Sequence, residues 1–159
     1  MTKTALVTAF ANLLEERLVS LRRVRDAARS GMRVDGDHRP SNRGERGAVT
    51  SQAYLAAGIK SRIDALEGDL ALLSQVDQEP RAQIAAGALV STEDDAGLEQ
   101  RYLLLPGAQG DALGTGGNPV TAVSPSSPIG RSLIGLTQGD CAEVMRAGRQ
   151  LELEILKVE

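Results

Sequence analysis

The sequence has few aromatic residues, one cysteine and one histidine, and each shortage excludes a class of site. Aromatic residues make up only 2% of the 159 residues, which argues against aromatic-lined pockets and stacking platforms for single-stranded nucleic acid. The single cysteine, Cys141, excludes an intramolecular disulfide and a cysteine-based zinc cluster. The single histidine, His38, excludes multi-histidine metal sites and disfavours a Ser-His-Asp triad.

Long apolar runs and a strong charge of one sign are also missing. No apolar stretch approaches the ~20 residues that a membrane-spanning helix requires. We therefore expect a cytoplasmic protein with no membrane contact. The formal net charge is −3, so the whole chain is no general binder of polyanions. Hydrophobic residues nevertheless make up 42% of the sequence, which is enough to bury a core.

Residues 1–76 predict an antiparallel helical hairpin, or coiled coil. Apolar residues recur at spacings of three and four over residues 4–30, with Thr2 or Thr4 as the cap. A second helix is predicted over residues 48–73, because apolar side chains step along it in a heptad-like seam. Several glycines and Pro40 interrupt residues 31–47, which we interpret as a charged tip loop. The seam consists of Leu55, Ile59, Ile63, Leu66, Leu70 and Leu73.

Residues 77–159 predict a second domain, a small antiparallel sheet with one short helix, so that the whole chain is of the α+β class. Ser127 is placed to cap the short helix, Pro128 occupies its first position, and Gly135 follows its end. We expect Ile129, Leu133 and Ile134 to pack in the core. The predicted strands cover residues 87–91, 98–105, 120–123, 141–146 and 150–158, with a turn at 147–148.

The main concentration of charge lies on the first helix and the tip. Residues 17–46 contain nine arginines against four acidic residues, a net charge of +5. Contact with nucleic acid or with an acidic protein channel is one interpretation. A solvated helix face is the other, and the sequence leaves both open. The candidate basic residues on the first helix are Arg22, Arg25 and Arg29.

One segment of the second half carries a recognisable motif. Residues 127–135 read SPIGRSLIG, and they are followed by Gly139-Asp140 and by a strand pair that ends over 151–158. This run is similar to the C-terminal signature of the GreA/GreB family of bacterial transcript-cleavage factors. Residues 58–70 (GIKSRIDALEGDL) resemble the second helix of that family. The arrangement of a helical hairpin followed by a small α+β domain also resembles the family.

The resemblance implies an accessory transcription elongation factor with no active site of its own. The C-terminal domain would be FKBP-like and would dock on RNA polymerase near the secondary channel, and the coiled coil would enter that channel. Contact with the nucleic acid of the elongation complex would be indirect. The docking residues implied by the motif are Ser127, Pro128, Ile129, Gly130, Arg131 and Ser132.

In the family, two acidic residues at the tip help to hold a second Mg²⁺ of the polymerase active site, which hydrolyses the transcript. No cofactor intrinsic to this chain is implied. Counting back without gaps from Arg62, Glu45 falls on the family's glutamate, but Asn42 falls on its aspartate. An amide is a poorer Mg²⁺ ligand than a carboxylate. Asp35 or Asp37 would fill the missing role if the longer loop folds differently.

Because the tip sequence differs from the family's pattern, a channel-blocking regulator without cleavage activity is an alternative to a cleavage factor. Arg43 and Arg46 flank the tip glutamate and would repel a cation. A prolyl isomerase is a further alternative, because the C-terminal fold would be FKBP-like. It is disfavoured, since this half of the chain has Tyr102 as its only aromatic residue. We expect a monomer, because the apolar seam is satisfied within the hairpin.

Overall fold

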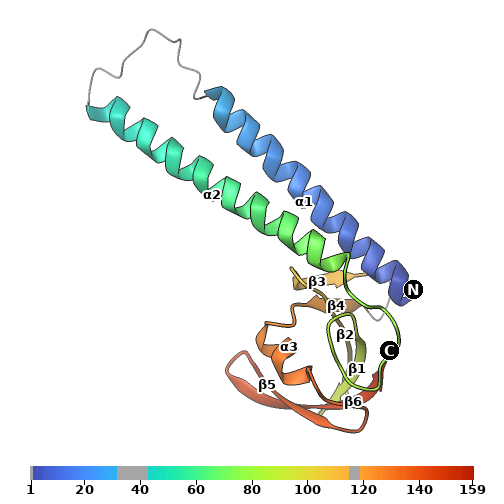
Figure 1. Cartoon of the computed structure of the whole chain (residues 1–159). Coiled ribbons are helices and arrows are strands. Elements are labelled where there is room, and N and C mark those ends of the chain that lie inside the picture. The colour runs from blue at the N-terminus through green and yellow to red at the C-terminus, as the bar shows by residue number, and fades with distance from the viewer. Residues whose placement is uncertain (1, 32–42, 115–118) are drawn as a thin grey trace. The chain divides into compact units, whose positions relative to one another are not determined.

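The computed structural model describes residues 2–31, 43–114 and 119–159 (Figure 1). Its contacts group the chain into two compact units. One unit is Leu13–Gly68, and the other consists of Met1–Asn12 and Asp69–Glu159. The expected fold class is confirmed, with two long helices followed by a sheet and a short helix. Within the described residues, no helix is long and apolar enough to cross a membrane. The elements are α1 (Lys3–Gly31), α2 (Arg43–Leu73), β1 (Leu89–Asp94), β2 (Glu99–Leu104), β3 (Gln109–Leu113), β4 (Val120–Val123), α3 (Pro128–Leu133), β5 (Cys141–Arg146) and β6 (Arg149–Val158).

An ion pair shows which residues of α1 and α2 lie opposite each other in the hairpin. The guanidinium of Arg22 lies 2.7 Å from the carboxylate of Glu67. α1 ends at Gly31, nine residues after Arg22, and the residue nine positions before Glu67 in α2 is Gly58. Because the helices are antiparallel, Gly31 and Gly58 lie opposite each other. The fifteen residues 43–57 of α2 therefore extend roughly 22 Å beyond the level at which α1 ends.

This stagger corrects two expectations about α2. The helix begins at Arg43, five residues before the predicted start at residue 48, so part of the predicted tip loop is helical. Leu55 is 59% exposed, although we expected it in the seam. The described part of α1 does not reach Leu55, whereas Ile59 and Ile63 lie level with α1 and are buried.

The six strands form one sheet in the order β3-β4-β2-β1-β6-β5. Four of its five neighbouring pairs are antiparallel, but β2 and β4 run parallel, with Leu103 opposite Ala122. Strand β3 was not predicted, because its sequence QGDAL is small and polar and lacks an alternating apolar pattern. The β5–β6 hairpin turns at Ala147 and Gly148, as predicted.

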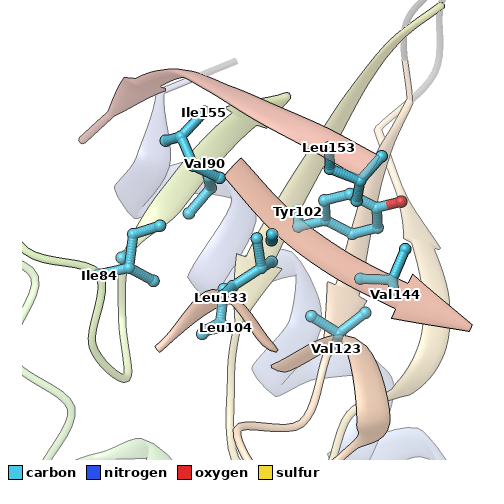
Figure 2. Packing of buried hydrophobic residues seen from close by; sticks show 11 residues of the cluster. Ile84, Val90, Tyr102, Leu104, Val123, Leu133, Val144, Leu153 and Ile155 are labelled. Carbon is cyan, nitrogen blue, oxygen red and sulfur yellow. The ribbon is translucent and has the colours of Figure 1, made fainter. Parts of the chain in front are cut away.

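The core of the second half lies between the sheet and α3. Figure 2 shows side chains from β1, β2, β4, β5 and β6 gathered around Leu133 of α3. Leu133 is fully buried, and so are Val90 and Leu104. Tyr102 is 4% exposed and belongs to this cluster, and its hydroxyl donates a hydrogen bond to the Gln100 side chain. The only aromatic residue of this half is therefore used in packing.

Candidate functional site

The motif segment forms α3, and its hydrogen bonds explain the residue types at its start. The backbone N–H of Gly130 donates to the Ser127 hydroxyl oxygen at 3.0 Å. The same hydroxyl donates to the carbonyl oxygen of Ser124 at 2.7 Å. Pro128 occupies the first turn, where a missing N–H costs nothing, and Gly135 follows the helix with a φ of +87°. The predicted helix and both of its end signals are confirmed.

The segment presents some residues to solvent and buries others. Pro128 and Arg131 are exposed, Ile129 and Ser132 are half-buried, and Gly130 is buried. Ile134 is 42% exposed, so our expectation that it packs in the core was wrong. The reason is that α3 ends at residue 133, and Ile134 has extended backbone angles that leave the helical periodicity.

An open groove of about 340 Å³ lies beside the segment. Its lining residues come from four elements or their ends, which the sequence pattern could not show to be neighbours. None of them is charged, and Val123 and Ala108 form buried parts of its wall. The lining consists of Ala108, Gln109, Gly110, Val123, Ser124, Ser127, Pro128, Ile129 and Met145.

The Gly139-Asp140 pair of the motif forms a tight turn between α3 and β5. The Asp140 carboxylate accepts hydrogen bonds from the Thr137 backbone N–H at 2.7 Å and from the Thr137 hydroxyl at 2.9 Å. These two donors hold the pKa of the Asp140 carboxyl below its usual value of 3.8. The Ile155 backbone N–H donates to the Asp140 carbonyl and so ties the turn to β6. The pair thus has a structural role.

We expect Asp140→Asn to remove an acid-sensitive part of the stability. The charged form of the Asp140 carboxyl is more stable in the folded state than in the unfolded state. The stabilisation from this carboxylate is therefore fully present above pH 3.8 and is lost as the pH falls through the lower pKa of the folded state. Urea unfolding from pH 7 to pH 2.5 would measure this. The variant should be less stable at neutral pH, and the gap should close at acid pH. A gap that does not change with pH would contradict the assignment.

The candidate basic residues of α1 are partly neutralised by neighbouring acids. Arg22 pairs with Glu67, and Arg25 lies 2.9 Å from the Asp26 carboxylate. Arg29 is exposed in the last turn of α1, where a cation is favourable to the helix dipole. The described face of α1 is therefore less strongly basic than the count of arginines suggested.

The predicted tip residues fall outside what the structure describes. Asp35, Asp37, Asn42 and His38 lie outside the described residues. Glu45 lies in the first turn of α2, but its side chain is also outside the described part. Among the side chains that are described, no group of three or more His, Cys, Asp or Glu residues could hold a metal ion. The role of the tip in holding Mg²⁺ therefore stays a prediction.

Cys141 is exposed at the start of β5 and shows no sign of a nucleophile. A hydrogen bond to Glu152 raises the pKa of its thiol, and the carboxylates of Glu154 and Asp140 act in the same direction. A raised pKa lowers the fraction of reactive thiolate at neutral pH.

A family model described as the C-terminal domain of the transcription elongation factors GreA and GreB matches residues 79–159. The chain belongs to the GreA/GreB family. The match includes α3, the groove and the Gly139-Asp140 turn, so the GreA/GreB motif and the site described above coincide. This agreement confirms the resemblance that the motif indicated.

Two GreA proteins illustrate the similarity to known relatives. The transcription elongation factor GreA of Methylococcus capsulatus is 29% identical over 162 residues, which cover 99% of this chain and 98% of that protein. GreA of Ruegeria pomeroyi is 33% identical over 102 residues, or 64% of this chain and 62% of that protein. Among solved structures, GreA factor homolog 1 (Gfh1) of Thermus thermophilus is similar at 22% identity, a TM-score of 0.41 and 94% coverage of both chains.

Proposed function

We propose that this GreA/GreB-family protein binds RNA polymerase near the secondary channel and modulates elongation or transcript cleavage. The observation that supports the proposal is the family match over residues 79–159, which includes α3. Pro128 and Arg131 are the exposed members of the predicted docking set, so they are available to a partner. The protein would act as a cytoplasmic monomer.

In this proposal the docked sheet domain positions the hairpin, and the hairpin carries the tip toward the polymerase active centre. Any RNA hydrolysis would be performed by the polymerase and its own Mg²⁺, so this chain is proposed as an accessory factor rather than an enzyme. The proposal has two versions, which differ in the role of the tip residues. Glu45 with Asp35 or Asp37 would support a cleavage factor, whereas Asn42 and the neighbouring arginines favour a regulator that blocks the channel.

A backtracked elongation complex of the cognate polymerase tests the proposal. We expect the protein to compete with a GreA factor for this complex, because Pro128 and Arg131 of the proposed docking set are exposed. RNA would be analysed with Mg²⁺ in the presence and absence of the protein, beside Glu45→Ala and the double variant Asp35→Ala/Asp37→Ala. Glu15→Ala, an exposed acidic residue on α1, is the matched control.

The outcomes separate the two versions. Short 3′ products that disappear only with a tip variant would establish a cleavage factor and identify the residue responsible. Competition without cleavage would establish a blocking regulator. A protein that neither cleaves nor competes at micromolar concentration would contradict the proposed function.

A further inference from the structure

We propose that residues 43–57, the first fifteen of α2, form a conformational switch that opens independently of the rest of the helix and closes when RNA polymerase covers it. The closing step rests on the proposed function, whereas the opening is a property of the free chain. We call this segment the overhang, because it lies beyond the level at which the described part of α1 ends. It comprises about four helical turns.

The overhang has little tertiary packing to keep it helical. Residues 47–55 are all exposed, and among them Val49 is 48%, Tyr54 77% and Leu55 59% exposed. Among the described side chains of α2, Ile59 is the first that is buried. Most helical stability in proteins comes from packing of one face, and a helix as short as the overhang is marginal in water without it. The helicity of the overhang therefore depends on its own sequence.

Glycines weaken the overhang at positions where no close contact requires a glycine. A Cβ at Gly47 or at Gly58 would meet nothing within 4 Å. In a helix interior, glycine disfavours the helical state by about fivefold relative to alanine. Gly58 lies at the junction between the overhang and the packed part of α2, so a helix that extends back from Ile59 has to pass Gly58 first. Opening at Gly58 therefore releases the whole overhang.

Ion pairs along the helix do not compensate for these glycines. The thirteen residues 47–59 contain no charged residue, so no pair of opposite charges can form within them. In contrast, Lys60 pairs with Asp64 at 2.7 Å in the part of α2 that lies level with α1. Several alanines favour the helical state, which brings helix and coil close in free energy. They are Ala48, Ala53, Ala56 and Ala57.

The same composition allows a protein surface to close the switch. A partner that covers residues 47–55 removes no charge from water and buries exposed apolar side chains. This burial supplies the packing that the free overhang lacks, and the entropic cost of ordering falls on the binding step. In the proposed function the hairpin enters the polymerase channel, whose wall would be that surface.

Hydrogen–deuterium exchange of the free full-length chain, followed by mass spectrometry, tests the opening. We expect the amides of residues 47–57 to exchange within about tenfold of the unfolded rate, and those around Ile63 to be protected at least about a hundredfold. Gly58→Ala should slow exchange in the overhang by about fivefold. Gly68→Ala is the matched control and should leave the overhang unchanged. A Cβ at Gly68 also meets nothing within 4 Å, but Gly68 lies beside Glu67, level with α1.

The same measurement with saturating RNA polymerase tests the closing. Exchange in the overhang should slow by at least about tenfold, and Gly58→Ala should bind polymerase severalfold more tightly, because less ordering is needed. Strong protection of the overhang in the free chain, or equal slowing in Gly68→Ala, would overturn the proposal. Polymerase that binds but leaves the exchange unchanged would overturn the closing step. A wild-type chain that does not bind would instead contradict the proposed function.

Discussion

Gly87→Ala is expected to lower the free energy of unfolding by about 3 kcal/mol or more, which combines backbone strain with overpacking. Gly87 has a φ of +89°, a conformation that alanine adopts at a cost. A Cβ built there would lie 2.3 Å from the Asp77 carbonyl oxygen and 2.6 Å from Val76 Cγ1. The backbone N–H of Gly87 also donates to the Leu104 carbonyl, so the segment cannot move away without losing that bond. Urea unfolding followed by circular dichroism would measure the change.

Gly97→Ala is the matched control for this prediction. Gly97 also has a positive φ, +75°, but a Cβ there would meet nothing within 4 Å. It should therefore cost only the backbone strain, ~1 kcal/mol. If the two variants lose the same stability, the close approach at Gly87 does not have the effect that we assign to it.

Leu133→Ala is expected to cost about 2–5 kcal/mol, the range for removing a large aliphatic side chain from a packed core. Leu133 is fully buried and joins α3 to the sheet cluster shown in Figure 2. The proposed docking residues lie on or next to the same short helix, so we expect polymerase binding to fall together with stability in this variant.

The neighbouring residue provides the comparison for Leu133. Ile134→Ala removes a similar side chain that is 42% exposed, and it should change stability by under ~1 kcal/mol. Thermal unfolding of both variants would measure the contrast. A large loss in Ile134→Ala, or a small one in Leu133→Ala, would show that the end of α3 packs differently.

The elements that the sequence predicted well are those whose signals are local. Thr2 caps α1 through its hydroxyl, which accepts from the Ala5 backbone N–H at 3.3 Å. Ser127 and Pro128 start α3, and the alternation of Leu151, Leu153 and Ile155 with glutamates marks β6. Each signal depends on atoms only a few residues apart. The local conformational preference of these segments therefore agrees with the conformation that they adopt in the folded protein.

The elements that the sequence missed depend on partners distant along the chain. Strand β3 has no apolar alternation, and it pairs with β4 through backbone hydrogen bonds that most sequences can make. The parallel pairing of β2 with β4 is a property of the whole sheet. Leu55 is exposed because α1 ends before it reaches that level of α2. The spacing of apolar residues along α2 does not show where its partner helix ends.

The sequence by itself determined the α+β class, the helical hairpin and the motif over residues 127–135 that marks the GreA/GreB family, because composition, periodicity and capping are local properties. Only the tertiary structure decided which side chains share a surface. It brought Met145 and Ala108 to the groove beside Ile129 and kept Tyr102 in the core. The physical reason is that strand order and crossing connections set which residues become neighbours, and many sequences with the same local pattern are compatible with different pairings.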